Sequence, residues 1–534
     1  MPTKVLMVYP RFVEESFWNY SITAELLGAR YPTSPLGLIT LAAMLPDSWT
    51  VRLINRNTGS LEDSDLEWAD LVMTGGMLFQ QADTLRLISL VQSHGKPVAV
   101  GGPDATSSPH IYAQADFRVL GEAEGIIDTF IAAWDEGVRA GVFEAEKFTA
   151  DVTKSPVPRF DLLKLEHYLF VGVQFSRGCP FTCEFCDIIE LYGRVPRTKA
   201  IPQILAELEA LYALGYRGHV DFVDDNLVGN KKALRELLPH LKAWQEAHGF
   251  PFEFSTEASI NLADDPDLLV LMRDCGFFAL FVGIESPDSA TLVAMKKKQN
   301  TRRSLTESVQ KFYDAGMFVT AGFILGFDSE SKSVAEPMAD FIEEAAIPVA
   351  MVGLLYALPN TQLTRRLIKE RRLFEGHDFH PDDSGDQCSR GLNYVTARPR
   401  GAILDDYRQV LTRIYDPAVF CERVERMIAQ LKLTKDAPRY LPGDPRRRRE
   451  METVERIVNR FPEWRKLLWG TFARCYQANP RAIRQTVMLL ALFLHLVPYS
   501  RRIIAGTDDA ITDIEAGQFI LPPIVGEPRY APAD

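Results

Sequence analysis

The sequence has few cysteines, no excess of basic charge and no apolar run of membrane length. Seven cysteines among 534 residues do not make a disulfide framework, and they are typical of a reducing compartment. The formal net charge of −12 argues against a nucleic-acid-binding protein, which needs a basic face. The first residues lack the apolar length and the cleavage site of a secretory signal. These absences predict a globular protein of the cytoplasm.

The most apolar stretch is 487–497, which contains His495 and is followed by Pro498. It is shorter than the roughly 18 residues that cross a bilayer, and Pro498 ends the apolar run. A buried helix is the simpler interpretation. The alternative is a surface that touches lipid or admits a lipid-like substrate, which would add a peripheral contact with the inner membrane to the cytoplasmic localisation.

Residues 1–150 alternate short aliphatic strands with helices. The pattern predicts an open parallel sheet covered by helices, a Rossmann-like arrangement that binds ligands beyond the carboxyl ends of its strands. Glycines gather at those expected ends, where they allow close backbone approach, although turn formation explains any single one of them. These glycines are Gly75, Gly76, Gly101, Gly102 and Gly121.

The rest of the chain divides into three parts. Residues 151–165 contain two prolines close together and are predicted to be a linker. Residues 166–370 contain six further strand–helix units, which predict a partial (β/α)6 barrel of the TIM type. From 371 to 534 the strand pattern fades, and a mostly helical domain is expected. The fold class is therefore α/β with a helical C-terminal domain.

The clearest chemical signal is the spacing C-x3-C-x2-C at Cys179, Cys183 and Cys186, directly after an expected barrel strand. Three thiolates can bind three irons of a cubane [4Fe–4S] cluster, and the fourth iron then stays open, because ordinary electron-transfer clusters use four cysteines. Zinc is the competing interpretation, but it needs four closed ligands in paired halves. Neither His167 nor His219 has the spacing of a second half, so we prefer the cluster.

With Phe185 as the aromatic residue before the third cysteine, the motif resembles the signature of radical S-adenosylmethionine (SAM) enzymes. In that family the reduced cluster transfers an electron to SAM and frees a 5′-deoxyadenosyl radical. The family often has Glu three residues after the second glycine of a G-x-I-x-G strand, whereas this chain has Ser329 there and Glu330 one position later. The resemblance implies SAM contacts at Phe185, Asp224, Asp225, Glu257, Glu285, Gly322 and Gly326.

The first 150 residues resemble the cobalamin-binding domain attached to many radical SAM enzymes. The similarity lies in the stretches SPLGL, GGP and GEAE. The chain lacks D-x-H-x-x-G, the motif in which histidine coordinates cobalt, as is normal in this subgroup. The resemblance implies cobalamin contacts at Pro35, Gly37, Gly75, Gly76, Gly101, Gly102, Gly121 and Glu122.

Stretches such as QFSRGCPFTCEFCDI, FVDDNLVGN and FVGIESP resemble the branch of this subgroup that includes the hopanoid C-methylases. That branch implies methylation of an unactivated carbon in a hydrophobic substrate, polycyclic isoprenoid or tetrapyrrole-like, by a deoxyadenosyl radical and methylcobalamin. An electron donor such as flavodoxin or ferredoxin is expected. The acid or base is open between Tyr168, Glu257 and Tyr356.

Three other functions compete with methylation. Oxidation, cyclisation or rearrangement with the same cofactors stays open. A methylthiotransferase would carry a second cluster on N-terminal cysteines, and no cysteine precedes Cys179. A cobalamin sensor with a vestigial barrel is disfavoured because the cysteine motif is intact.

Overall fold

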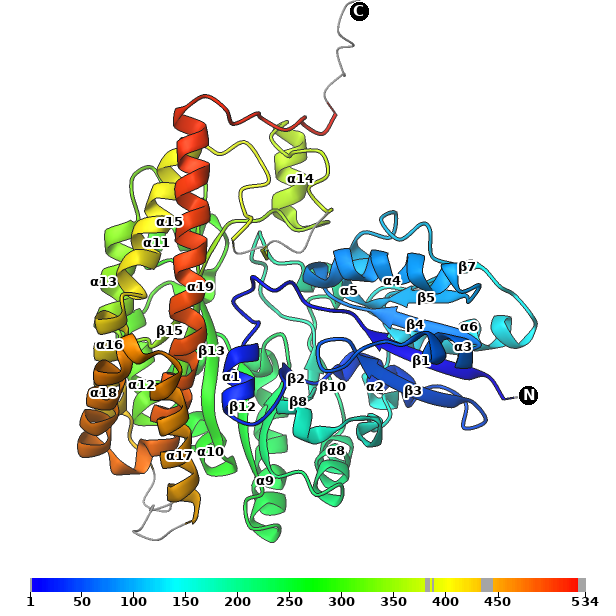
Figure 1. Cartoon of the computed structure of the whole chain (residues 1–534), viewed down its shortest axis with the longest axis horizontal. Helices are drawn as coiled ribbons and strands as arrows, with labels where there is room; N and C mark the ends of the chain where they lie inside the picture. Colours follow the sequence, from blue (N-terminus) through cyan, green and yellow to red (C-terminus); the bar gives the residue numbers. More distant parts are fainter. Residues whose placement is uncertain (1, 380–384, 387–388, 434–444, 527–534) are drawn as a thin grey trace, which may run out of the picture.

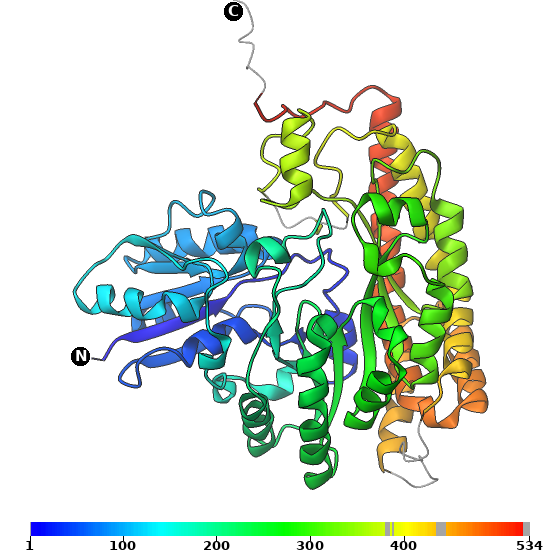
Figure 2. The same cartoon turned by 180° about the vertical axis from the view of Figure 1, so that it is seen from behind.

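A computed structural model describes residues 2–379, 385–386, 389–433 and 445–526. Figure 1 shows an N-terminal sheet with its helices on one side of the molecule. The barrel and the C-terminal helices lie on the other side, and Figure 2 shows the same two halves from behind. The α/β fold with a helical C-terminal part is confirmed.

The N-terminal sheet is entirely parallel and contains the five strands expected from the sequence plus one more. Because β3 lies on one side of β1 and β4 on the other, the chain order reverses between β1 and β4, the position where such sheets bind ligands. In spatial order the strands are β3 (Thr50–Asn55), β1 (Lys4–Tyr9), β4 (Leu71–Gly75), β5 (Val98–Gly101), β6 (Phe117–Leu120) and β7 (Gly141–Glu144).

Helices cover both faces of this sheet because successive side chains of β1 point to opposite faces. Leu6 and Val8 pack against α3 (Asp63–Trp68), α4 (Gln81–Ser93) and α5 (Gly102–Ser107). Val5 and Met7 pack on the other face, against α2 (Leu36–Ala42) and α6 (Ile127–Asp135). The two apolar clusters are separate, so the sheet is a buried middle layer.

The second sheet is the parallel half-barrel, and it contains all six expected strands. A seventh strand, β2, comes from the N-terminal region and pairs with β8, Tyr31 opposite Tyr168 and Thr33 opposite Phe170. In spatial order the strands are β15 (Val349–Leu354), β14 (Phe318–Leu325), β13 (Phe277–Glu285), β12 (Phe252–Glu257), β11 (Gly218–Phe222), β8 (Tyr168–Val173) and β2 (Tyr31–Thr33). Its helices include α8 (Ile201–Ala213), α9 (Lys231–Ala247), α10 (Pro266–Cys275), α12 (Leu305–Asp314) and α13 (Ala335–Glu344).

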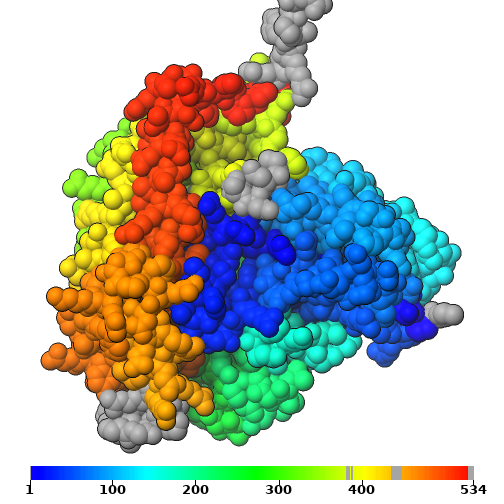
Figure 3. All heavy atoms as spheres, viewed as in Figure 1, coloured from blue at the N-terminus to red at the C-terminus, as the bar shows by residue number. Residues whose placement is uncertain are grey.

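The C-terminal helices pack beside the barrel, and α19 also contacts the N-terminal segment. The Thr23 hydroxyl of α1 (Ser21–Leu26) donates to the carbonyl oxygen of Ala491, at 3.1 Å. A ring nitrogen of His495 lies 3.1 Å from the carbonyl oxygen of Phe17, and Figure 3 shows this blue segment lying against the red helix. The helices are α14 (Gln362–Lys369), α15 (Arg400–Ile414), α16 (Pro417–Gln430), α17 (Pro445–Arg460), α18 (Arg465–Ala478) and α19 (Ile483–Glu515).

Pro498 ends the apolar run but not the helix, because α19 continues through it to Glu515. Contacts with α15, α16, α17 and α18 run along α19 and outweigh the hydrogen bond that proline removes. Among the described residues, 480–515 is the one helical segment long and apolar enough to cross a membrane. Its most apolar window is 67% buried inside the protein, as in a core helix, which agrees with the buried-helix interpretation.

Candidate active site

The loop that carries the three cysteines, Gly178–Cys186, is called the cluster loop below. It follows β9 (Ser176–Arg177) and is fixed by carboxylates from the end of β11. Asp224 accepts hydrogen bonds from the backbone N–H of Phe175, at 2.9 Å, and from the Ser176 hydroxyl, at 2.5 Å. Asp225 accepts from the backbone N–H of Gly178 at 2.9 Å. Burial raises the pKa of Asp224 to about 7 and that of Asp225 to about 6.

Cys179, Cys183 and Cys186 are free thiols on this one loop, close enough to influence one another electrostatically. Side-chain amides of Asn226 and Gln299 donate to the sulfurs of Cys179 and Cys183, at 3.8 and 3.6 Å. Among the described residues, no three His, Cys, Asp or Glu side chains surround a single ion.

Phe185 of the cluster loop and Glu285 share Lys297 as a neighbour. The Phe185 ring packs edge-on against Phe327 at 5.9 Å, and the Lys297 ammonium lies 5.8 Å from the Phe185 ring centre. Glu285, at the end of β13 with φ of 68°, forms a buried ion pair with Lys297. Its carboxylate is therefore already neutralised by the protein.

Gly322 of β14 and Gly326, which directly follows this strand, differ in how well a larger side chain would fit. A Cβ on Gly322 would lie 3.2 Å from the Phe281 ring, a tight contact. Gly326 has φ of 106°, and a Cβ there would lie 2.6 Å from Leu392, so only glycine fits. The Gly326 N–H donates to Glu330 at 3.0 Å, so Glu330 binds the end of its own strand.

The glycines of the N-terminal sheet allow the strand ends to pack closely against one another. A Cβ on Gly75 would lie 2.6 Å from the carbonyl oxygen of Gly101, and one on Gly101 would lie 2.8 Å from that of Val119. The Gly76 Cβ would meet the Gln80 side chain at 2.6 Å. Packing thus explains these residues without a ligand. Gly102 and Gly121 have positive φ, Gly37 has open space where a methyl group would lie, and Pro35 precedes α2.

Glu122 belongs to an ionic network that joins the N-terminal sheet to a two-stranded sheet of β9 and β10 (Arg197–Thr198) next to the cluster loop. Its carboxylate pairs with Arg177 at 3.2 Å and with Arg197 at 2.8 Å, and Arg177 also pairs with Glu124 at 2.8 Å. Burial alone would raise the pKa of Glu124, but the hydrogen bonds and charge of Arg177 outweigh it and lower the value to about 2. Arg177 directly precedes the cluster loop, so the network ties that loop to the N-terminal sheet.

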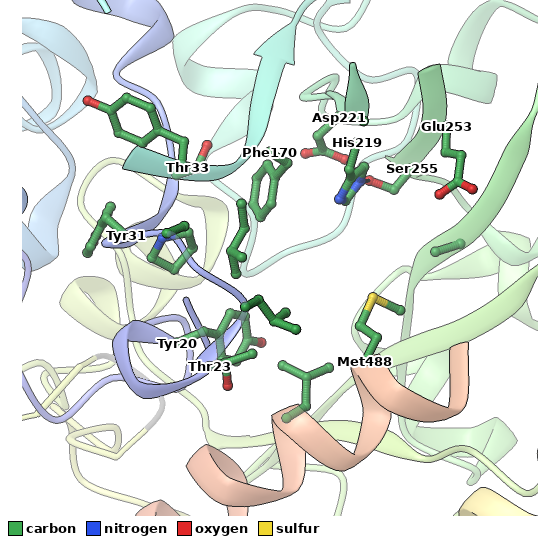
Figure 4. Close-up of a pocket in the computed structure, with 18 of the residues that line it drawn as sticks. Tyr20, Thr23, Tyr31, Thr33, Phe170, His219, Asp221, Glu253, Ser255 and Met488 are labelled. Atoms are coloured by element: carbon green, nitrogen blue, oxygen red, sulfur yellow. Dashed lines mark hydrogen bonds between the residues drawn. The ribbon is translucent and has the colours of Figure 1, made fainter. Parts of the chain in front are cut away.

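A cavity of about 1200 Å³ fills the half-barrel. Side chains from β2, β8 and β11–β15 line it, together with α1 and α19 (Figure 4). Most of its wall is apolar or aromatic. The apolar wall includes Phe17, Trp18, Phe170, Phe278, Phe281, Met351, Met488 and Leu492.

Glu257 lines this cavity at the carboxyl end of β12. The side chain of Glu257 is exposed to the open space of the cavity, and protein surrounds that space. Glu257 is therefore accessible and still has a strongly raised pKa. Burial and then the charge of Asp221 raise its pKa to about 8. Of the three open acid–base candidates, Glu257 and Tyr168 line the cavity, whereas Tyr356 is absent from the lining and its hydroxyl bonds the backbone of His377.

A second polar group, not expected from the sequence, lies on the neighbouring strands β11 and β12. His219 Nε2 lies 2.6 Å from the Ser255 hydroxyl, which in turn donates to Asp221. Figure 4 shows the three side chains together in the cavity wall. The i, i+2 spacing of residues 219 and 221 in a strand was the available signal, since it places both on one face.

Two family models match separate parts of the chain: the radical SAM superfamily at 173–342 and a domain of unknown function at 361–509. An uncharacterized methyltransferase of Synechocystis sp. is 44% identical over 81% of this chain and 80% of its own length. The hopanoid C-2 methylase of Rhodopseudomonas palustris is 34% identical over 95% of each chain. The chain belongs to the radical SAM methyltransferases.

This radical SAM methyltransferase has the fold of a solved relative, the cobalamin-dependent SAM radical enzyme OxsB with aqua-cobalamin and SAM bound. The TM-score is 0.61 at 14% identity, covering 97% of this chain and 82% of that structure. The family membership implies SAM and a [4Fe–4S] cluster as cofactors. The expectations of a radical SAM enzyme and of methyl transfer are confirmed.

Proposed function

We propose that this enzyme uses cobalamin to methylate an unactivated carbon of an apolar polycyclic molecule, of the hopanoid or a related isoprenoid class. The observation that carries the proposal is the largely apolar cavity of about 1200 Å³, which reaches the strand ends beside the cluster loop. Cavities of this size and lining suit large apolar ligands. The 34% identity to a hopanoid C-2 methylase favours an isoprenoid over a tetrapyrrole-like substrate.

In this proposal Cys179, Cys183 and Cys186 hold the cluster, and Asp224 and Asp225 fix the loop that presents them. When bound, the cluster supplies the electron that starts the radical reaction, and a donor such as flavodoxin or ferredoxin restores it. The paired Glu285 and Lys297 add no net charge beside the cluster loop. The hydrogen bonds to Asp224 and Asp225 fix the cluster loop, which favours precise positioning of SAM.

Cobalamin would lie at the switch point between β1 and β4, and when bound it supplies the methyl group. Three apolar side chains face the cavity there: Phe12, Met77 and Phe79. Met77 is 43% exposed, and the Phe12 and Phe79 rings stack at 6.2 Å. Such a surface fits a large flat ligand held without a histidine. Glu122 is already paired with two arginines, so we assign it to the ionic network and not to cobalamin.

Within the same proposal, residues 1–150 bind cobalamin, 151–165 link, 166–370 bind the cluster and SAM, and 371–534 complete the cavity wall. Strand β2 is the exception, because it lies in the first range and joins the barrel sheet. The enzyme would act in the cytoplasm, with a peripheral contact at the inner membrane. The exposed apolar residues Phe519, Ile520 and Leu521 support that contact.

The test is turnover of anaerobically reconstituted enzyme with SAM carrying a labelled methyl group and a hopanoid substrate. We expect one labelled methyl in the product for each turnover, together with 5′-deoxyadenosine. Deoxyadenosine formation with an oxidised or rearranged, unlabelled product would contradict methylation and support the alternative outcome.

A further inference from the structure

The polarity of the cavity wall changes along the barrel axis. Its upper end reaches Val223 and Glu257, at the carboxyl ends of β11 and β12, beside the carboxylates that fix the cluster loop. Its lower end reaches Gly218 and Glu253, at the amino-terminal ends of the same strands. Glu253 and Glu257 are four residue steps apart along β12, which is about 13 Å at the usual strand rise. The cavity therefore extends well below the level of the cofactors.

The lower half of the cavity contains a hydrogen-bonded set, His219, Ser255 and Asp221, which we call the cavity floor. In the sheet His219 lies opposite Glu253, and Asp221 lies opposite Ser255, two residues before Glu257. With the histidine neutral, His219 Nε2–H donates to Ser255, and the Ser255 hydroxyl donates to Asp221 Oδ1. Burial lowers the pKa of His219 to about 3, which agrees with the neutral ring. Within the described residues, His219 Nδ1 and Asp221 Oδ2 have no hydrogen-bond partner, although both side chains line the cavity. Two acceptors are thus left for a ligand donor.

Helix α19 adds polar groups next to the cavity floor. Arg484 pairs with Glu253 at 2.6 Å, and both line the cavity. The side-chain oxygen of the neighbouring Gln485 is buried and has no partner among the described residues. A buried acceptor without a donor is costly, and a ligand hydroxyl would satisfy it.

Between the two ends the wall is apolar. The His219 ring itself packs between Phe170 and Phe278, with ring centres 5.0 Å away on each side. Met488 of α19 lies on the opposite wall (Figure 4). A ligand that fills the cavity must therefore be apolar along its body and carry its hydrogen-bond donor at one end.

We propose that the cavity floor binds a hydroxyl group at one end of the apolar substrate, so that the methyl group is added at the opposite, apolar end. This inference rests on the proposed function and defines the substrate further. His219, Asp221 and Ser255 are specificity-determining residues, because a site built to bond a hydroxyl discriminates strongly against an analogue without it. They take no part in the chemistry at the cofactors.

The experiment compares two hopanoids, a hydrocarbon and its counterpart with a hydroxyl on the terminal side chain, in wild type, Ser255→Ala and His219→Phe. The wild type should show a higher kcat/KM for the hydroxylated compound, and each substitution should reduce that preference about tenfold or more. Thr320→Val is the matched control. It removes a cavity-wall hydroxyl from β14, where Thr320 bonds the carbonyl oxygen of Leu280 at 3.4 Å, and it should keep the preference.

Mass spectrometry or NMR of the product locates the methyl group, which we expect on the ring farthest from the hydroxyl. Equal kcat/KM for both compounds in the wild type, an unchanged preference in both floor variants, or methylation next to the hydroxyl would each overturn the inference while leaving the proposed function intact. Failure of the wild type to methylate either compound would instead overturn the proposed function, and this inference with it. Deoxyadenosine formation without substrate checks that each variant has folded and loaded its cluster.

Discussion

The residues of β11 and the residues that follow this strand are held in different ways. Beyond the carboxyl end of β11, Asp224 fixes the residues just before the cluster loop, and Asp225 and Asn226 contact the loop itself through hydrogen bonds to a backbone group and a sulfur. Within β11, His219 and Asp221 line the cavity and meet Ser255 from β12. The residues next to the cluster loop thus depend on a few local contacts. The residues of the cavity floor depend on the alternation of side chains along β11 and on a neighbour that is distant in sequence.

The largest effect is expected at the cofactor edge, for Cys183→Ala. Loss of one thiolate leaves an iron without its ligand, so cluster binding and all deoxyadenosine formation should disappear. Iron content and deoxyadenosine are measured on anaerobic protein. The control is Cys275→Ala, a buried cysteine that donates to the Leu238 carbonyl and should leave the cluster intact. A Cys183 variant that still made deoxyadenosine would refute the cluster assignment.

The next largest effect, on stability, is expected for the ionic network of Glu122, Glu124 and Arg177, of which Arg177 directly precedes the cluster loop. Arg177→Met leaves Glu122 and Glu124 buried without one of their cations, which should cost about 3–5 kcal/mol in the free energy of unfolding. Arg159→Met is the matched control, because Arg159 pairs with Asp161 in the same bidentate way but on the surface, where such a pair contributes about 0–1 kcal/mol. Urea unfolding measures both. Equal losses would show that burial of the network has no energetic consequence.

The same network sets a pH dependence. The pKa of Glu124 is about 2 in the folded chain and 4.5 for an ordinary glutamate, so its contribution to stability is complete above 4.5 and disappears as the pH falls toward 2. In Arg177→Met, the free energy of unfolding should fall less steeply between pH 4.5 and pH 2 than it does in the wild type. An acid limb identical to that of the wild type would contradict the assignment of this shift to Arg177.

A smaller effect is expected at the end of β14. Gly326→Ala places a methyl group against Leu392 at a positive φ, which should destabilise the protein by about 1–3 kcal/mol. Gly37→Ala has open space and a helical position, so it should be neutral or stabilising by up to about 1 kcal/mol. The melting temperatures of the two variants compare them directly, and a Gly326 variant as stable as wild type would show that the strand end relaxes freely.

The smallest effect is expected for Glu257→Gln at the upper end of the cavity, because this side chain is exposed and solvent screening reduces the free energy that its pKa shift represents. The folded pKa of Glu257 is about 8, above the ordinary 4.5, so its contribution is favourable below 4.5 and is lost as the pH rises toward 8. The glutamine variant carries no such charge. The difference in melting temperature between the variant and the wild type should grow in favour of the variant from about pH 5 to pH 8 and then stay constant. A pH-independent difference would contradict an ionisation in this range.

The parts of the molecule that the sequence predicts well are those set by local patterns. The cysteines share one short loop, and the aliphatic runs define the strands of both large sheets apart from β2 and β7. The pairing of β2 with β8, the continuation of α19 past Pro498 and the ion pairs of Glu122 all join residues far apart in sequence. No local pattern encodes these contacts, because they depend on how finished elements pack.

The most direct test of the central claim, that three thiolates hold a cubane with one iron open to SAM, is electron paramagnetic resonance of the reduced, anaerobically reconstituted enzyme. We predict the signal of a reduced [4Fe–4S] cluster, with g-values that shift when SAM is added. A spectrum without a cubane signal, or one that SAM leaves unchanged, would contradict the account.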